Sequence, residues 1–408
     1  MAHAADETVR WNGASGGAVS LVLTNLLDRG VIRGAVVAAS DPDDVAFGRG
    51  VFARTREEIL AGAQSRYTTT PVLAAVREAL AEPGPFAVVG LPCQIHAMRK
   101  AQAARPEWRA RFPLLLGLFC SSRLPEEATR ELASIFCPRG AHPVGVQYRL
   151  KSDDGWPHNT FNFAFSDGSR WRSPLGPLQT VGLLARFYPR RRCASCVDAS
   201  AECADLAFGD PWILTRKGKW KYDDRGGWTT VPVRTAAGAA AVEHAQASGS
   251  LVLREITPEE IASGQARMLI QKKKCRPFHI ALRRRLGLPV PEYGVSFPPT
   301  TWRAVRDEVF SLACQALGRI GVVRRACIRF LLGRVGSVLM LRWARHKQRS
   351  TAAEQHGGDG APRRDVHCGL CHLPLAGLLN GGASLLEDVS ARWYQVLDAL
   401  AMLMPVEF

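Results

Sequence analysis

The sequence predicts an α/β protein with a mainly parallel sheet covered by helices, an antiparallel hairpin insertion and a helical, basic C-terminal extension. Three observations lead to this fold class. Short continuous apolar runs alternate with helical patterns over residues 1–140, which is typical of parallel strands joined by helical crossovers. Polar and apolar residues then alternate in two neighbouring segments, which indicates a half-exposed antiparallel hairpin. Arginines and partly helical apolar spacing dominate residues 301–349.

The same changes of pattern divide the 408 residues into four parts. We predict an N-terminal α/β part at 1–140, a second part with a Cys-x-x-Cys loop at 141–300, a basic helical extension at 301–349, and a linker with a tail at 350–408. A chain of this length can bury a large core.

In chain order, the first helix is predicted after the glycine-rich segment 13–17, and it ends at Gly30, because glycine commonly follows a helix. The run 34–39 predicts a central strand, and Thr55 to Glu58 form the capping-box pattern that opens a helix. Further helices are predicted at 72–80, 94–103, 126–136 and 236–247, further strands at 86–89, 114–119, 206–208 and 226–235, and the hairpin at 145–150 with 159–165.

Four cysteines occupy similar places relative to these strands. Cys93 and Cys120 each follow a buried apolar run, and Cys193 and Cys196 stand at Cys-x-x-Cys spacing in an arginine-rich loop before the strand 206–208. Functional residues of open α/β sheets gather at the carboxyl ends of the strands, so we expect the four thiols to converge on one four-thiolate site. A Cys-x-x-Cys pair alone is ambiguous among zinc, a redox dithiol, an iron–sulfur cluster and two unrelated core cysteines.

The segment Gly13-Ala-Ser-Gly-Gly stands immediately before the first helix. Glycines at a helix start let backbone N–H groups approach an anion closely, and the helix dipole favours negative charge there. The alternative interpretation is an ordinary glycine-rich cap on a core helix.

Several motifs occur in the order found in one family. They are Ser15-Gly-Gly, Arg54-Thr-Arg-Glu-Glu-Ile-Leu, Gln64-Ser-Arg-Tyr, Gly90-Leu-Pro-Cys-Gln, Gly117-Leu-Phe-Cys, Arg192-Cys-x-x-Cys-x-Asp, Ala204-Asp-Leu-Ala-Phe-Gly-Asp and Lys272-Lys-Lys. Over about residues 11 to 300 the chain resembles the coenzyme F420 hydrogenase/dehydrogenase beta-subunit family. Members of that family carry FAD and a 4Fe-4S cluster, and they include a deazaflavin-reducing hydrogenase subunit and reductases of chlorophyll intermediates.

The resemblance implies which residues bind each group. It assigns the 4Fe-4S cluster to Cys93, Cys120, Cys193 and Cys196, and FAD to Ser15, Gly16, Gly17, Ser65, Arg66, Tyr67 and Lys273. Two positions depart from the family pattern. Gln64 stands where glycine is usual, and Cys203, the main rival ligand, stands where leucine is usual. Alternative interpretations of the second loop are a solvated Arg66 and a packed Tyr67.

Family members often have a further ferredoxin-like cysteine cluster upstream of the glycine-rich segment. This chain begins too late to hold one, so we expect a separate electron-donor protein. The function implied is an oxidoreductase that passes electrons between a 4Fe-4S cluster and FAD and reduces or oxidises a small organic substrate by hydride transfer. The competing class is a non-enzymatic, zinc-binding, basic interaction module. No residue identifies the substrate, a general acid or a general base.

Positive charge is concentrated in one stretch. Residues 266–349 hold 19 Lys and Arg against 3 Asp and Glu, an excess of 16 that equals the net charge of the whole chain. An anionic ligand, an anionic membrane surface or a solvated helix face would account for it. No nucleic-acid motif accompanies the charge, so we expect no nucleic-acid partner and a peripheral membrane contact through the basic C-terminal helices.

The chain is expected to be cytoplasmic. No stretch of about 18 predominantly apolar residues is present. Asp6 and Glu7 stand where a secretory signal would be positive, and the eleven irregularly spaced cysteines fit reduced thiols and cluster ligands. The tail contains His367-Cys-Gly-Leu-Cys-His, whose Cys-x-x-Cys-His spacing is compatible with covalent haem attachment, a small zinc site or an unliganded tail.

Overall fold

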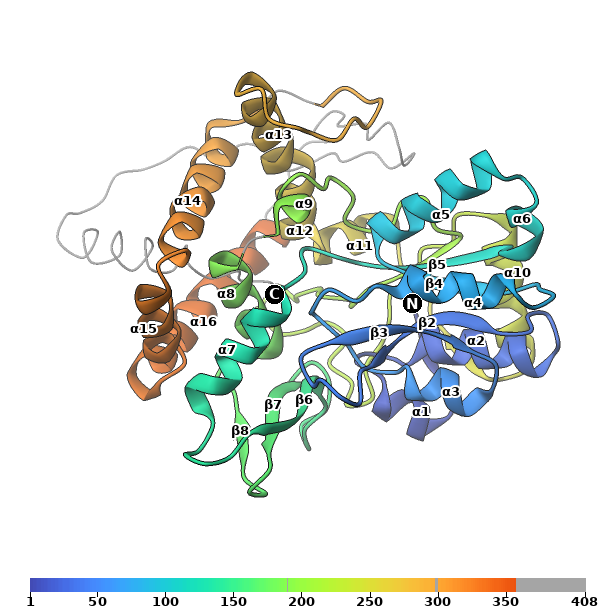
Figure 1. Cartoon of the computed structure of the whole chain (residues 1–408), viewed down its shortest axis with the longest axis horizontal. Helices are drawn as coiled ribbons and strands as arrows, with labels where there is room; N and C mark the ends of the chain where they lie inside the picture. Colours follow the sequence, from blue (N-terminus) through green and yellow to red (C-terminus); the bar gives the residue numbers. More distant parts are fainter. Residues whose placement is uncertain (189, 298–299, 357–408) are drawn as a thin grey trace. The chain divides into compact units, whose positions relative to one another are not determined.

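The computed structural model describes residues 1–188, 190–297 and 300–356 (Figure 1). They form two compact units. The first unit comprises Met1–Pro177, Arg190–Pro211 and Tyr222–Ile256, and the second takes in the rest of the described chain. None of the described helices is long and apolar enough to cross a membrane.

A five-stranded sheet forms the centre of the first unit. Its order is β3 (Gly48–Ala53), β2 (Ala35–Ser40), β4 (Ala87–Gly90), β5 (Leu114–Leu118) and β9 (Leu206–Phe208). The pairs β2–β4, β4–β5 and β5–β9 are parallel, and the edge strand β3 is antiparallel to β2. The mainly parallel sheet predicted from the apolar runs is therefore confirmed.

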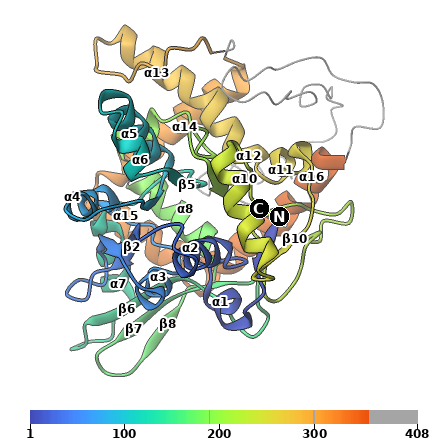
Figure 2. The same ribbon diagram turned by 90° about the vertical axis from the view of Figure 1, so that its right-hand side faces the viewer.

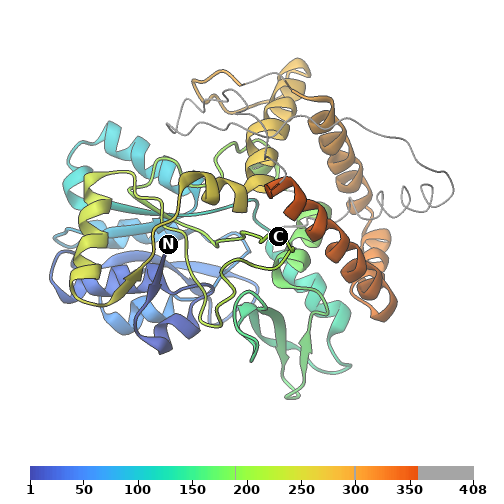
Figure 3. The same cartoon turned by 180° about the vertical axis from the view of Figure 1, so that it is seen from behind.

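Helices cover both faces of this sheet. Alternate strand residues such as Val37, Val89 and Leu116 share a core with α2 (Ala18–Asp28) and α10 (Ala236–Ala247). These two helices lie side by side (Figure 2), and the view from behind shows α10 in yellow-green (Figure 3). The intervening strand residues pack on α4 (Val76–Leu80) and α5 (Pro92–Ala104). Burial on both faces explains why the strands are continuously apolar.

Two smaller sheets complete the first unit. The strands β1 (Ala2–Ala4) and β10 (Leu251–Leu253) pair antiparallel. The predicted hairpin is confirmed by β6 (Pro143–Leu150) and β7 (Thr160–Phe165), and β8 (Arg170–Arg172) adds a third strand. The other helical segments are α1 (Glu7–Asn12), α3 (Arg56–Ala61), η1 (Val72–Ala75), α6 (Trp108–Arg111), α7 (Glu126–Phe136) and α9 (Arg191–Ala194).

Two predictions about secondary structure are wrong. Residues 226–235 do not form a continuous strand. Thr230 and Val233 make only isolated antiparallel bridges alongside β9, to Gly209 and Leu206, and Thr229 bridges to Ala2 of β1. Pro232, which lies between the two bridges to the β9 segment, has no backbone N–H to donate to a ladder. The linker does not begin at residue 350, because α16 (Arg334–His356) continues through Ser350-Thr-Ala-Ala-Glu-Gln-His. Alanine, glutamate and glutamine are good helix formers, and Gly357 is the first glycine after them. The tail motif at 367–372 lies outside the described residues.

The second unit is helical, as predicted for the C-terminal extension. Its elements are α8 (Pro177–Phe187), α11 (Pro258–Gly264), α12 (Ala266–Ile270), the π-helical segment η2 (Gln271–Cys275), α13 (Arg276–Arg285), α14 (Trp302–Gly318), α15 (Gly321–Leu331) and α16. A buried cluster joins α13 to α14. The Glu308 carboxylate lies 3.3 Å from the Arg276 guanidinium and 2.9 Å from Nδ1 of His279.

Candidate functional site

Cys93 and Cys120 follow neighbouring parallel strands. The last residue of β4, Gly90, pairs with Gly117 of β5, so the two strands end at the same edge of the sheet. Cys93 lies in the first turn of α5, and Cys120 lies two residues beyond β5. This placement at the carboxyl edge is the one that the sequence predicted.

The loop after Cys196 comes directly against this edge. The backbone N–H of Cys120 donates to the Ala199 carbonyl at 2.9 Å. A Cβ on Gly117 would lie 2.2 Å from Cβ of Ala201, so the loop can approach β5 only because residue 117 is glycine. Ala201 itself adopts a left-handed conformation with φ of 53°. The backbone therefore brings the loop that carries Cys196 beside the strand that leads to Cys120.

Asp198 ties the same loop to α5. Its buried carboxylate accepts backbone N–H groups from Ser200 at 3.1 Å and Glu202 at 3.0 Å, and its Oδ2 lies 2.9 Å from Nε2 of His96. His96 stands one helical turn after Cys93. Hydrogen bonding to Asp198 first, and to Cys203 next, raises the pKa of His96 to about 10, so this imidazole is positively charged at neutral pH.

Arg123 places a second positive charge beside the cysteines. Its two terminal nitrogens donate to the carbonyls of Arg66 and Thr68, whereas its buried Nε has no hydrogen-bond partner among the described residues. Burial lowers the pKa of Arg123, and the charges of Cys120 and Cys193 act in the opposite direction. A guanidinium with an unpaired buried N–H next to two thiols fits a negatively charged group held by thiolates.

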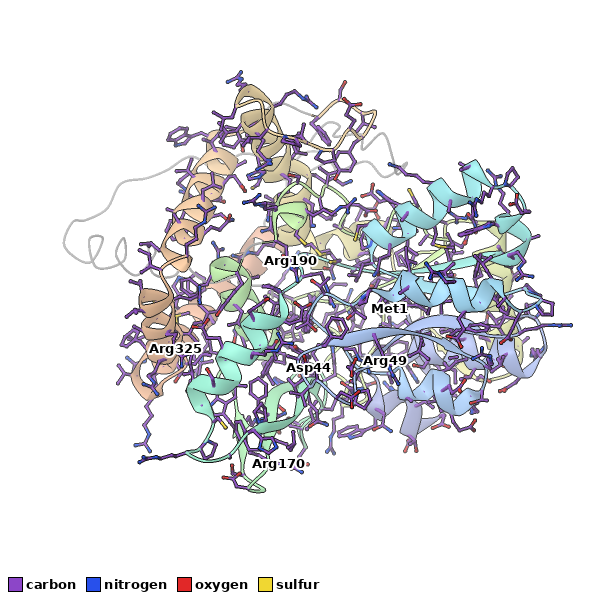
Figure 4. All side chains as sticks on the ribbon, viewed as in Figure 1. Met1, Asp44, Arg49, Arg170, Arg190 and Arg325 are labelled. Atoms are coloured by element: carbon purple, nitrogen blue, oxygen red, sulfur yellow. The ribbon has the colours of Figure 1, made fainter. Side chains whose placement is uncertain are left out.

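The thiols themselves do not yet define a ligand set. None of the four forms a disulfide, and within the described residues no three or more His, Cys, Asp or Glu side chains form a group that could hold a metal ion. Cys203 lies in the same neighbourhood, where its backbone carbonyl accepts a hydrogen bond from Nε of Arg99 at 2.9 Å. The choice of Cys93, Cys120, Cys193 and Cys196 stays a prediction. Figure 4 labels Arg190, the residue before the helix α9 that carries Cys193.

Hydrogen bonds from residues far along the chain fix the glycine-rich loop before α2. Thr229 Oγ1 accepts the Gly16 N–H at 3.0 Å and lies 2.8 Å from Ser15 Oγ, and the buried Lys151 ammonium donates to the Ser15 carbonyl at 2.6 Å. Gly17 is the N-cap, with φ of 72°, and no side chain caps α2. The first N–H groups of α2 are therefore not capped by a side chain, which suits an anion.

Packing within the protein leaves no room for a side chain at Gly16 or Gly17. A Cβ on Gly16 would lie 2.7 Å from the Ala2 carbonyl oxygen, and one on Gly17 would lie 2.7 Å from that of Val9. The sequence left two explanations open for these glycines, close approach to an anion and an ordinary helix cap; close packing against β1 and α1 is by itself sufficient to require both. Flavin contact by Ser15, Gly16 and Gly17 stays a prediction.

In the second loop predicted to contact FAD, residues 64–67, the side chains of Arg66 and Tyr67 contact other parts of the protein. Arg66 donates to its own loop, including the Gly62 carbonyl at 3.0 Å, and burial lowers its pKa to about 10. The Tyr67 ring meets that of Tyr148 edge to face. Gln64 has φ of 77°, a conformation that favours glycine, which explains why glycine is usual there in the family. Ser65 stands between these residues, and contact of the loop with FAD stays a prediction.

The sequence interpretation missed a buried charged group on the hairpin. Arg149 makes a bidentate pair with Asp210 at 2.7 and 2.9 Å, and Nε1 of Trp156 donates to the same carboxylate at 3.2 Å. Lys151 lies two residues further along, and burial together with the Arg149 charge lowers its pKa to about 7. Basic residues at inward positions of a half-buried segment were the signal that could have revealed them.

Lys273, the remaining predicted FAD residue, lies in the second unit. It is half-buried in the π-helical segment η2, next to the buried Lys272. π-helical turns are rare and often occur at functional sites. Its role as a FAD contact stays a prediction.

The fold and its cysteine-bearing sheet edge define an α/β protein with its candidate site at the carboxyl ends of parallel strands. Comparison with known families gives matches to two models of a single family. The N-terminal model of the coenzyme F420 hydrogenase/dehydrogenase beta-subunit family matches residues 1–77, and the C-terminal model of the same family matches residues 85–259. The chain belongs to this family of oxidoreductase subunits, as the motifs predicted.

Relatives extend this result. The coenzyme F420 hydrogenase subunit beta of Methanococcus voltae is 27% identical over 298 residues, covering 71% of this chain and 96% of that protein. Its counterpart from Methanothermobacter thermautotrophicus is 28% identical over 308 residues, with the same coverage of 71% and 96%. A chain of the F420-reducing hydrogenase complex from Methanosarcina barkeri superposes with a TM-score of 0.54 at 20% identity, over 72% of this chain and 95% of that chain, which shows a shared fold.

Proposed function

We propose that this chain is an iron–sulfur flavoprotein subunit. It would pass electrons between a 4Fe-4S cluster and FAD, and reduce or oxidise a small organic substrate of the coenzyme F420 type by hydride transfer. The names of its relatives support the oxidoreductase class and coenzyme F420 as the substrate type.

One observation carries the cluster proposal: three segments far apart in the sequence reach one edge of the sheet with their cysteines. Cys120 is bonded to the loop through Ala199, and the helix of Cys93 is bonded to it through His96 and Asp198. Two positive charges, His96 and Arg123, lie at this edge, and positive charge favours thiolates over thiols. Cys93, Cys120, Cys193 and Cys196 would hold the cluster, which would supply one-electron transfer.

The FAD proposal is supported by the N-terminus of α2. In the described chain no side chain caps this helix, and the loop before it is fixed by Thr229 and Lys151. Ser15, Gly16 and Gly17 would receive the flavin phosphates there.

The proposal also includes a separate electron-donor protein. The solved structural relative is itself a chain of a hydrogenase complex, which is consistent with a partner protein for this chain. Electrons entering this chain would then come from that partner and leave through the flavin.

Anaerobic purification tests the proposal. The protein should show flavin absorption and broad iron–sulfur absorption, with about four iron and four sulfide per chain as the cluster type requires, and reduced coenzyme F420 should bleach the flavin. A colourless, zinc-containing protein would contradict it and favour the alternative, a non-enzymatic zinc-binding interaction module.

A further inference from the structure

The C-terminal helices α15 and α16 expose an unusual mixture of side chains. Of the large apolar residues that the described chain exposes, most follow residue 285, and several stand on these two helices. Val322 is 81% exposed and Val335 is 66% exposed. Both helices lie beyond residue 259, where the family match ends.

Exposed apolar and basic positions stand close together along both helices. We call them the basic apolar face. It consists of Val322, Phe330, Val335, Val338 and Leu339 together with Arg329, Arg334 and Arg342. The opposite sides of the helices are buried, through Ile328, Leu331, Met340 and Ala344. Each helix therefore has one buried side, and its exposed positions carry valines, leucine, phenylalanine and arginines.

The face has no acidic residue to balance its arginines. No Asp or Glu occurs between Val309 and Ala353 in the sequence, whereas nine Lys and Arg do. Arg329, Arg334 and Arg342 form no ion pair with any described residue. A surface of this kind has a positive potential that attracts anions.

We propose that the basic apolar face is a peripheral membrane-binding surface for anionic phospholipid headgroups. Helices that lie in a membrane interface combine arginines with apolar side chains, the former reaching phosphates and the latter entering the acyl boundary. A protein partner would need an acidic surface of matching shape, whereas anionic headgroups can meet any exposed array of arginines and apolar side chains. This inference does not rest on the proposed redox function.

Vesicle co-sedimentation of the full chain tests the proposal. The probes are vesicles of phosphatidylcholine alone and of phosphatidylcholine mixed with phosphatidylglycerol. The chain should sediment with the anionic vesicles and not with the neutral ones, and added salt should weaken binding by screening. Equal binding to both vesicle types, or no binding to the anionic ones, would overturn the proposal.

Matched variants locate the surface. The combined change Arg329→Gln, Arg334→Gln and Arg342→Gln should weaken the partition coefficient on the order of 100-fold, since each basic residue near an anionic surface contributes substantially. The control is Arg139→Gln, Arg170→Gln and Arg172→Gln, which removes the same charge from exposed positions of the first unit (Figure 4 labels Arg170) and should change binding by less than about threefold. Equal weakening by both sets would show non-specific attraction and overturn the proposal.

A third variant separates the membrane from a second copy of the chain. Val335→Ser, Val338→Ser and Leu339→Ser should weaken anionic-vesicle binding about 10-fold or more, since less apolar area enters the interface. Circular dichroism confirms folding of each variant. If these changes instead convert a dimer to a monomer and leave vesicle binding unchanged, the face is an interface between copies and the proposal fails.

Discussion

Replacing Asp198 by alanine tests how the Cys-x-x-Cys loop is held. The buried carboxylate accepts the N–H groups of Ser200 and Glu202 and an ion-paired hydrogen bond from His96. Hydrogen bonds to a charged group contribute about 1.5–3 kcal/mol each when buried, and water can partly replace those to the half-buried N–H groups. We therefore expect Asp198→Ala to lower the free energy of unfolding by about 3–4 kcal/mol. Asp198→Asn, which keeps an acceptor and loses the charge, should cost about 1–2 kcal/mol.

Urea unfolding of the iron-free proteins, followed by tryptophan fluorescence, measures this difference. The control is Asp223→Asn at an exposed position, which should stay within about 0.5 kcal/mol of the original chain. The pH dependence has a defined sign. Because the folded-state pKa of His96 is raised to about 10 from 6.5, its stabilising contribution is complete below pH 6.5 and is lost as the pH rises through 10. If Asp198→Ala unfolds like the control, the loop is not held by this carboxylate.

Three further perturbations follow from the same contacts. Arg149→Lys cannot keep the bidentate pair with Asp210 and should lower the unfolding free energy by about 3 kcal/mol, so a thermal midpoint equal to that of the original chain would contradict the buried pair. Arg123→Gln should lower the reduction potential of the bound cluster by about 50 mV, because a nearby positive charge stabilises the added electron, and potentiometric titration showing no shift would refute this. Gly117→Ala should destabilise the chain by about 2 kcal/mol, and a second change, Ala201→Gly, should restore most of that loss, whereas additive effects of the two changes would exclude their contact.

The central sheet was predictable because its parallel strands are buried on both faces. The segments that became β2, β4, β5 and β9 are short and uniformly apolar, a pattern with few alternatives. The edge strand β3 escaped prediction because Gly48-Arg-Gly-Val-Phe-Ala contains two glycines and an exposed arginine. Gly50 is required by tertiary packing, since a Cβ there would lie 2.4 Å from the Val72 carbonyl oxygen.

The candidate site was predictable only in part, for a related reason. The places of Cys93 and Cys120 follow from strand ends, which local sequence reveals. The groups that surround them do not, because His96 and Asp198 are 102 residues apart in the chain and meet only in the folded structure. Arg123 likewise has no local pattern that marks it, since its role depends on the carbonyls and thiols around it.

Serine variants of individual cysteines test the central claim most directly. The measurement is iron content together with low-temperature paramagnetic resonance of the reduced, anaerobically purified proteins. We expect Cys193→Ser and Cys196→Ser each to lose the 4Fe-4S signal, and Cys203→Ser to retain it, because the thiolate pair and not its neighbour ligates the cluster. An unchanged cluster in both the Cys193 and the Cys196 variants would contradict the proposed site.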